Sequence, residues 1–327
     1  MSGKYEKDMK YEQYTKDKLK GEPDVLVEYY YSLLGAGKSY RTVYRYINYI
    51  LNFLNFTFED EYKQKGRQFY LEVKPVHINK YISSLRNINK NGEVKKASDS
   101  IVTVQWSALN SFFQFLTPEY IATNPVAGTQ RPKMKDNPNV TYLTNKEISK
   151  LLKYVEKNAV ERFKNRDLCI LKLGFSTGLR VSAIVQIDID DIDFNNNQIR
   201  VTEKGDRDEY VMFGEQLKAQ LMLWLADREK YFANCKSKAL FVSQKNTRIS
   251  TTAVGTIISG YAKHVTDKHV TPHVMRHSCA TNLYEKTGDI YLCASQLHHR
   301  NVATTQRYAE ISKSRKKEAT NILDNLI

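Results

Sequence analysis

Five side chains in the second half of the chain have the types that attack on a phosphodiester requires. They lie in three short motifs, TGLR, TPHVMRHSCATNL and LHHRNVATTQRYAEI, and are Arg180, His273, Arg276, His299 and Tyr308. A threonine–proline pair opens the second motif, which places His273 and Arg276 on one face near the amino end of a helix, where anions are favoured. An arginine in that position can hold a phosphate through two parallel hydrogen bonds. The three motifs together predict a site that binds and cleaves a phosphodiester.

Taken singly, these residues have plainer interpretations. An isolated arginine is more often part of a surface ion pair, and Tyr308 is one of 22 tyrosines. The order of the motifs is more specific: TGLR, a lysine in a hairpin turn, H-x-x-R-H, then L-x-H with a tyrosine nine residues beyond the histidine. This order resembles the tyrosine recombinase or phage integrase family. The resemblance runs from about Thr144 to Tyr308, and the helical first half with its NP-containing linker is similar to the core-binding domain of that family.

The resemblance implies a role for each residue and a shape for the whole. Around the scissile phosphate it would place Arg180, Lys204, His273, Arg276 and His299, with Tyr308 as the nucleophile. The two domains would form a C-shaped clamp around duplex DNA.

The chemistry of this assignment is consistent with the residue types. A phenol has a pKa near ~10, so Tyr308 needs nearby cations and a base, for which His273 is the candidate. The two arginines would stabilise the charge that builds on the phosphate, and His299 would add a hydrogen bond. Lys204 would protonate the departing 5′ oxygen, although Arg207 in the same turn could be confused with it. The product would be a 3′ phosphotyrosine, which keeps the bond energy and requires no ATP, metal or other cofactor for rejoining.

Two positions depart from the family pattern. Ala183 stands where the family often has an acidic residue, three positions after Arg180. His298 stands where the family usually has glycine, directly before His299. Histidine enters the left-handed conformation more readily than most residues, so we expect the turn to survive. Another carboxylate would have to replace the one missing at Ala183.

Metal sites are the competing interpretation of two segments. His273 and His277 have the spacing of a helical zinc site, but Val274 replaces the glutamate base and Arg276 would place a cation beside the metal. Four aspartates in IDIDDIDF could suggest a magnesium nuclease; they are Asp188, Asp190, Asp191 and Asp193. We expect them on a solvated strand edge, with the isoleucines between them facing the core, and we expect no metal.

The first half is predicted to be a helical bundle. Ser39 can cap a helix to about Phe58, and a second long helix follows in SDSIVTVQWSALNSFFQFL, with shorter helices near 23–34 and 75–86. Polar residues lie opposite the apolar face of both long helices. A solvated face has the same appearance, but these residues are suited to DNA contact and are Arg41, Arg45, Ser100, Thr103, Ser107 and Asn110.

The second half is predicted to combine helices with one small sheet. Thr144 and Glu147 have the spacing of a capping box, which opens the second domain. Alternating residues around 199–201 and 211–213 predict a hairpin, with a third antiparallel strand from IDIDDIDF, and the chain is helical again from Ser250. The expected fold class is therefore mainly α with a small antiparallel β-sheet in two domains.

Composition and the position of a proline-rich segment divide the chain into five parts. A segment rich in proline and cations predicts a linker, which gives a charged leader 1–21, a helical DNA-binding domain 22–123, a linker 124–141, a catalytic domain 142–308 and a tail 309–327. The net charge of +14 is shared by both halves and favours a polyanionic partner. There is no apolar stretch long enough for a membrane span and no secretory signal, so we expect a cytoplasmic protein with four reduced, mostly buried cysteines.

These expectations favour a site-specific DNA recombinase that exchanges strands through a Holliday junction. Its partners would be a double-stranded recombination site and three further copies of itself in a tetramer, with a monomer in the absence of DNA and no membrane contact. Two alternatives stay open: a monomeric type IB topoisomerase-like enzyme, and a DNA-binding regulator whose active site has decayed at Ala183 and His298. The apolar end of the tail, Ile322 to Leu326, could close its own domain or dock on a neighbouring protomer.

Overall fold

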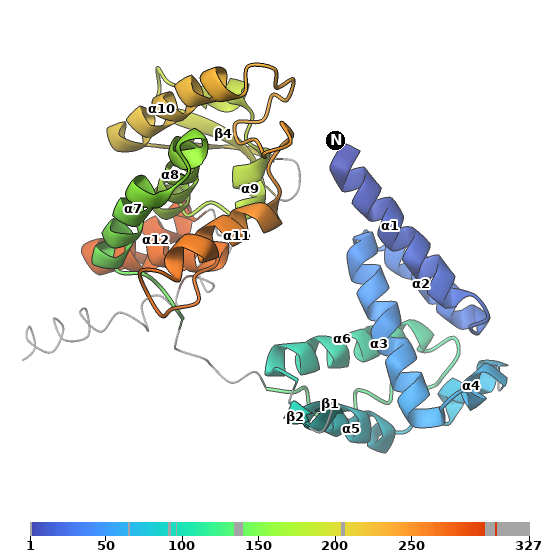
Figure 1. The fold of residues 1–327 in the computed structure, drawn as a ribbon. Coiled ribbons are helices and arrows are strands. Elements are labelled where there is room, and N and C mark those ends of the chain that lie inside the picture. Colours follow the sequence, from blue (N-terminus) through green and yellow to red (C-terminus); the bar gives the residue numbers. More distant parts are fainter. Residues whose placement is uncertain are drawn as a thin grey trace, which may run out of the picture. The chain divides into compact units, whose positions relative to one another are not determined.

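A computed structural model describes residues 2–64, 66–90, 93–95, 97–133, 140–203, 207–297 and 305 of the chain (Figure 1). The chain divides into two compact units, Met1–Asp136 and Asn137–Ile327. The division falls inside the segment 124–141 for which a linker is predicted. Both units are mostly helical, and the second contains a three-stranded antiparallel sheet, which confirms the predicted fold class.

The first unit is built from helices and one short hairpin. Its elements are α1 (Ser2–Leu19), α2 (Asp24–Gly35), α3 (Tyr40–Phe58), α4 (Glu61–Gln64), α5 (Pro75–Ser84) and α6 (Asp99–Leu116), with 3-10 turns at Gly66–Leu71 and Leu85–Asn87, and strands β1 (Ile88–Lys90) and β2 (Glu93–Lys95).

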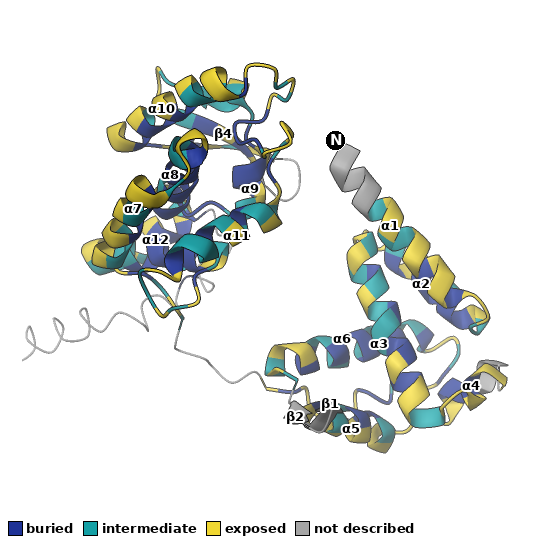
Figure 2. Ribbon diagram, in the orientation of Figure 1, coloured by how far each residue is buried: buried dark blue, intermediate teal, exposed yellow. Residues whose placement is uncertain are grey.

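Helices α3 and α6 form the centre of this unit. Each begins with a serine whose hydroxyl accepts a hydrogen bond from the first turn, Ser39 from Thr42 N and Ser98 from Ile101 N. The apolar residues that recur at helical spacing in both helices are buried against each other and against α2 (Figure 2). The prediction of two amphipathic helices at these positions is confirmed.

Two features of the first unit were not predicted from the sequence. The charged leader 1–21 contains α1, which packs along α3: Tyr11 and Tyr14 contact Tyr44, with ring centroids 5.6 Å and 6.2 Å apart, and Thr15 is buried. The hairpin of β1 and β2 was not predicted, since its strands are only three residues long and carry no extended alternation of apolar residues.

The second unit surrounds its small sheet with helices. Its elements are α7 (Asn145–Asn158), α8 (Glu161–Thr177), α9 (Val181–Gln186), a 3-10 turn (Ile189–Asp191), strands β3 (Ile192–Asp193), β4 (Gln198–Glu203) and β5 (Arg207–Met212), then α10 (Glu215–Tyr231), α11 (Thr251–Ala262), α12 (Pro272–Thr287) and α13 (Ile290–Gln296). The strand order is β3-β4-β5, antiparallel throughout.

Helix α8 is the central element of this unit. It contacts α7, α10 and α12, and most of its residues are buried. The approach of α12 is close at Gly174, where an added Cβ would lie 1.8 Å from Cε of Met275. The absence of a side chain at Gly174 therefore lets the helix that carries His273 and Arg276 pack directly against α8.

The beginning of the second unit agrees with the sequence prediction. Thr144 accepts a hydrogen bond from Glu147 N, and Glu147 accepts one from Thr144 N in return, which is the predicted capping box. All four cysteines are free thiols, three of them buried. Among the described residues no helix is both long and apolar enough to cross a membrane.

Candidate functional site

Helix α12 positions the second predicted motif. Thr271 caps its amino end by accepting a hydrogen bond from Val274 N, and Pro272 occupies the first helical position. His273 is exposed in the first turn, whereas Arg276 is only 5% exposed. A buried guanidinium requires fixed hydrogen-bond acceptors, because an unpaired buried charge is strongly unfavourable.

The acceptors of Arg276 are two backbone carbonyls from distant segments. Its Nη1 donates to the carbonyl oxygen of Gly178 at 2.7 Å, and its Nη2 donates to that of Leu297 at 2.6 Å. Gly178 belongs to the TGLR motif and Leu297 to the start of the third motif. Arg276 thus joins segments 119 residues apart in the chain, and the three motifs meet at one place in the fold.

The TGLR turn ends α8 and begins α9. Gly178 has a φ of 65°, the left-handed conformation that L-residues avoid, and an added Cβ would lie 2.6 Å from Cδ2 of Leu297. Two residues later Arg180 is the N-cap of α9, and its side chain is partly exposed. The glycine therefore allows both the reversal of the chain and the contact with Leu297, and it sets the point from which Arg180 emerges.

We expect Gly178→Ala to lower the free energy of unfolding by about 1–2 kcal/mol for the left-handed conformation alone, with a further loss from the contact with Leu297. Urea unfolding measures this change. The control is Gly260→Ala in α11, where no atom lies within 4 Å of an added Cβ. That substitution should be neutral or stabilising by up to about 1 kcal/mol, because alanine favours helix. Equal effects of the two substitutions would contradict the role assigned to Gly178.

Further contacts connect α13 and α12 to the same turn. Gln296 donates from Nε2 to the carbonyls of Ser176 and Thr177, both at 3.4 Å, and Cys279 Sγ lies 3.7 Å from the Ser176 carbonyl. Burial raises the pKa of the Cys279 thiol to about 12, so it stays protonated and unreactive at neutral pH. These contacts hold the end of α13 immediately before the segment that contains His299.

Three predicted catalytic residues, Lys204, His299 and Tyr308, lie outside the described residues, as does His298. The strands that flank Lys204 are described: Glu203 and Arg207 are partners in the register of β4 and β5. The hairpin predicted around Lys204 is therefore present.

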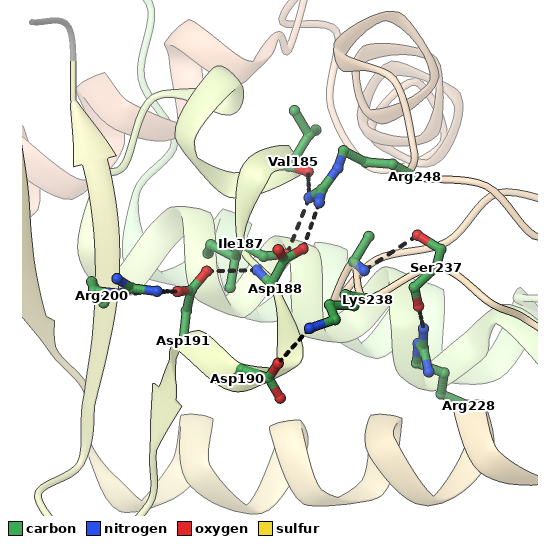
Figure 3. Close-up of polar contacts among 11 residues, drawn as sticks. Val185, Ile187, Asp188, Asp190, Asp191, Arg200, Arg228, Ser237, Lys238 and Arg248 are labelled. Carbon is green, nitrogen blue, oxygen red and sulfur yellow. Dashed lines mark hydrogen bonds and ion pairs between the residues drawn. The ribbon is translucent and has the colours of Figure 1, made fainter. Parts of the chain in front are cut away.

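The aspartate segment, considered from the sequence as a metal site, has other partners in the structure. Within residues 140–203 and 207–297, as in the rest of the described chain, no three His, Cys, Asp or Glu side chains form a metal-binding group. Figure 3 shows three of the four aspartates paired with cations: Asp188 with Arg248, Asp191 with Arg200 at 2.7 Å, and Asp190 with Lys238 at 3.6 Å.

The aspartate segment also differs from the predicted strand edge. Residues Ile189–Asp191 form a 3-10 turn, and only Ile192 and Asp193 form a strand. Among the isoleucines Ile187 is buried, but Ile189 and Ile192 are only partly so. The carboxylate of Asp191 accepts from Asp188 N, so side chain and backbone close the turn in place of a longer ladder.

The predicted DNA-contact residues of the first unit have differing exposure. Arg41 and Arg45 on α3 and Ser100 on α6 are exposed. Thr103 is buried, and its hydroxyl lies 2.8 Å from the carbonyl of Asp99 and 3.2 Å from that of Pro132. Thr103 therefore does not present its hydroxyl to DNA in this conformation, because a residue of the linker covers it.

The other two polar residues of α6 are partly buried and have protein partners. Ser107 donates to the carbonyl of Thr103, and Asn110 accepts from Asn124 at 3.0 Å. The bond of Ser107 lies within α6, whereas the partner of Asn110 comes from outside the helix, so residue spacing alone could not reveal the contact with Asn124.

The two carbonyls that hold Arg276 were not foreseen from the sequence. Backbone acceptors leave no mark in side-chain type, and the only signal was indirect, in the glycine of TGLR and the leucine before His298. Likewise, Ala183 is buried in the core of the second unit. A carboxylate at that position would have to be accommodated within the core.

Comparison with known proteins agrees with this geometry. Residues 141–315, more than half of the chain, match the phage integrase family. The tyrosine recombinase XerC of Vibrio cholerae is 29% identical over 247 residues, which cover 75% of this chain and 78% of the relative.

Two solved structures share the fold. The XerH site-specific recombinase bound to its palindromic difH substrate has a TM-score of 0.64 at 21% identity, covering 88% of this chain and 90% of that one. A lambda integrase tetramer bound to a Holliday junction has a TM-score of 0.63 at 16% identity, covering 87% and 76%. The motifs that Arg276 brings together, the match over residues 141–315 and the shared fold establish that this chain belongs to the phage integrase family of tyrosine recombinases.

Proposed function

We propose that this chain is a site-specific recombinase in which Tyr308 attacks a DNA phosphodiester and forms a 3′ phosphotyrosine. As a tyrosine recombinase it cleaves and religates DNA strands. The observation that carries the proposal is the buried guanidinium of Arg276, which ties the turn before Arg180 to the segment before His299. Cationic side chains that are held in place before the reaction lower the energy of a negatively charged transition state, because they need not reorient as the charge develops.

Each residue has a chemical task in this proposal. Arg180 and Arg276 bind the non-bridging oxygens of the phosphate, where the planar guanidinium outperforms an ammonium. His273, exposed in the first turn of α12, accepts the proton of the Tyr308 phenol, and His299 donates a further hydrogen bond. Lys204, between β4 and β5, protonates the 5′ oxygen as it leaves. No step requires a metal or a cofactor.

The finer assignments follow from the same mechanism. The electron pair of the phenolic oxygen forms the bond to phosphorus while the bond to the 5′ oxygen breaks, so the ester is conserved and a 5′ hydroxyl from a second duplex can reverse the reaction. Sequential exchange of this kind passes through a Holliday junction and needs four protomers, which we propose assemble on two synapsed sites from monomers. The first unit contributes contacts through the exposed Arg41, Arg45 and Ser100.

The test begins with the DNA that the enzyme itself selects. Covalent complexes trapped in cells and sequenced give the target and the cleavage position, from which a suicide substrate is built. We expect the purified chain to form a covalent adduct with this substrate equally well in EDTA, and mass spectrometry to place the nucleotide remnant on Tyr308.

Other outcomes of this experiment identify the alternatives. Cleavage abolished by EDTA would indicate a metal nuclease. Specific binding without any adduct would indicate the decayed regulator, and relaxation of supercoiled DNA without a paired site would indicate a topoisomerase-like enzyme. A remnant on another side chain would overturn the assignment of Tyr308.

A further inference from the structure

The chain enters the second unit along α12. Residues 140–144 precede α7 (Figure 1). Leu143 is completely buried in the core. Both backbone groups of Leu143 are bonded to α12: its N–H donates to Ser278 Oγ at 2.8 Å, and its carbonyl accepts from Asn282 Nδ2 at 2.9 Å. The end of the interdomain segment is thus fastened to a helix of the catalytic machinery.

Neighbouring contacts secure the same stretch. The hydroxyl of Ser278 also donates to the carbonyl of Val274 at 2.6 Å, so it acts as a donor and as an acceptor at the same time. Lys268 donates to the carbonyl of Tyr142 at 2.9 Å and to the carboxylate of Glu147 at 2.8 Å. We call residues 141–144 the entry strap. These hydrogen bonds attach it to α12 and to the start of α7.

The helical period relates the entry strap to the active site. Ser278 and Asn282 are four residues apart and share one face of α12. Arg276 precedes Ser278 by two residues, which turns its side chain about 200° away from that of Ser278. Arg276 accordingly reaches Gly178 and Leu297 on one side of the helix, while Ser278 and Asn282 hold Leu143 on the other.

We propose that Ser278 and Asn282 are positioning residues that link the interdomain segment to the orientation of Arg276. This inference rests on the proposed function. A displacement of the entry strap rotates or shifts α12 as a rigid body, and the guanidinium of Arg276 moves with it relative to the phosphate. Because a helix has no internal joint between positions 276 and 282, the strap sets the geometry of catalysis without touching DNA.

The test is a comparison of single-turnover cleavage rates at saturating substrate with DNA affinity. We expect Asn282→Ala in the full chain to slow covalent adduct formation about tenfold, since small displacements of a catalytic group are costly, while the Kd for the target changes by less than about threefold. Asn282→Gln keeps the amide and should recover part of the rate. The matched control is Asn158→Ala, which removes a hydrogen bond of 2.8 Å from the side-chain amide to the carbonyl of Tyr154 at the end of α7. The rate of this variant should equal that of the wild type.

A double-mutant cycle separates positioning from general loss of structure. If Asn282 acts through Arg276, then Asn282→Ala should lower the rate by less than about twofold when Arg276→Lys is already present. A tenfold loss in both backgrounds would overturn the inference, as would a wild-type rate for Asn282→Ala. Failure of the proposed function is distinguishable, because then the wild-type chain forms no adduct, or carries the nucleotide remnant on a side chain other than Tyr308.

Discussion

Tyr308→Phe is expected to bind the target DNA with unchanged affinity and to form no covalent adduct. The substitution removes only the oxygen that attacks phosphorus, so the cations around the phosphate and the contacts to DNA are retained. Loss of a nucleophile typically lowers the rate by at least about 10⁴-fold, which places the reaction below detection in a gel assay of protein–DNA adducts. A gel-shift titration on the same DNA measures affinity.

The matched control is another tyrosine of the same unit. Tyr291 in α13 is 73% exposed, and Tyr291→Phe should form the adduct at the wild-type rate. Adduct formation by Tyr308→Phe would show that a different side chain is the nucleophile. Loss of adduct in both variants would point to a damaged fold, which circular dichroism would detect.

Arg276→Ala is expected to damage both stability and catalysis. The carbonyls of Gly178 and Leu297 would each lose a charged donor in a buried environment, at a cost of about 1–3 kcal/mol per group. The cleavage rate should fall by about 10³-fold, as for removal of one donor that stabilises a transition-state oxyanion. Arg276→Lys keeps the charge but lacks the planar fork, so we expect it to recover only a small part of the activity.

A control variant separates the effect of Arg276→Ala on stability from its effect on the cleavage rate. The control is at Arg248, a second arginine that also donates to backbone carbonyls. Arg248 donates to the carbonyls of Val185 and Ile187 and pairs with Asp188 (Figure 3). Arg248→Ala should lower the free energy of unfolding while leaving the cleavage rate of the folded protein unchanged. If Arg276→Ala and Arg248→Ala lost stability and activity in the same proportion, the catalytic assignment of Arg276 would be contradicted.

The secondary structure around the motifs could be predicted because its signals are local. Ser39 and the pair Thr144 and Glu147 form caps that depend only on residues within one turn, and the structure confirms both. The helical period of the apolar residues in α3 and α6 likewise reports which face is buried, whatever the partner. The order of chemical side chains in the second half was sufficient to indicate the family.

Predictions that depended on a remote partner were less successful. Thr103 has the same type and spacing as exposed residues of its helix, but the carbonyl of Pro132 covers its hydroxyl. The packing of the charged leader on α3 was not predicted, because its contacts are supplied by tyrosines, which pack on Tyr44 of α3. In both cases the deciding contact joins residues about 30 positions apart.

The sequence by itself determined the chemical inventory of this protein: its cationic and imidazole groups, its late tyrosine, its caps and its helical faces. Only the tertiary structure decided that Arg276 is buried and shared between two backbone carbonyls, and that Leu143 is bonded to the opposite face of the same helix. The reason is physical. The type and spacing of side chains can be read directly from the sequence. Backbone carbonyls are chemically identical at every residue, so only the folded structure determines which of them accepts from a given donor.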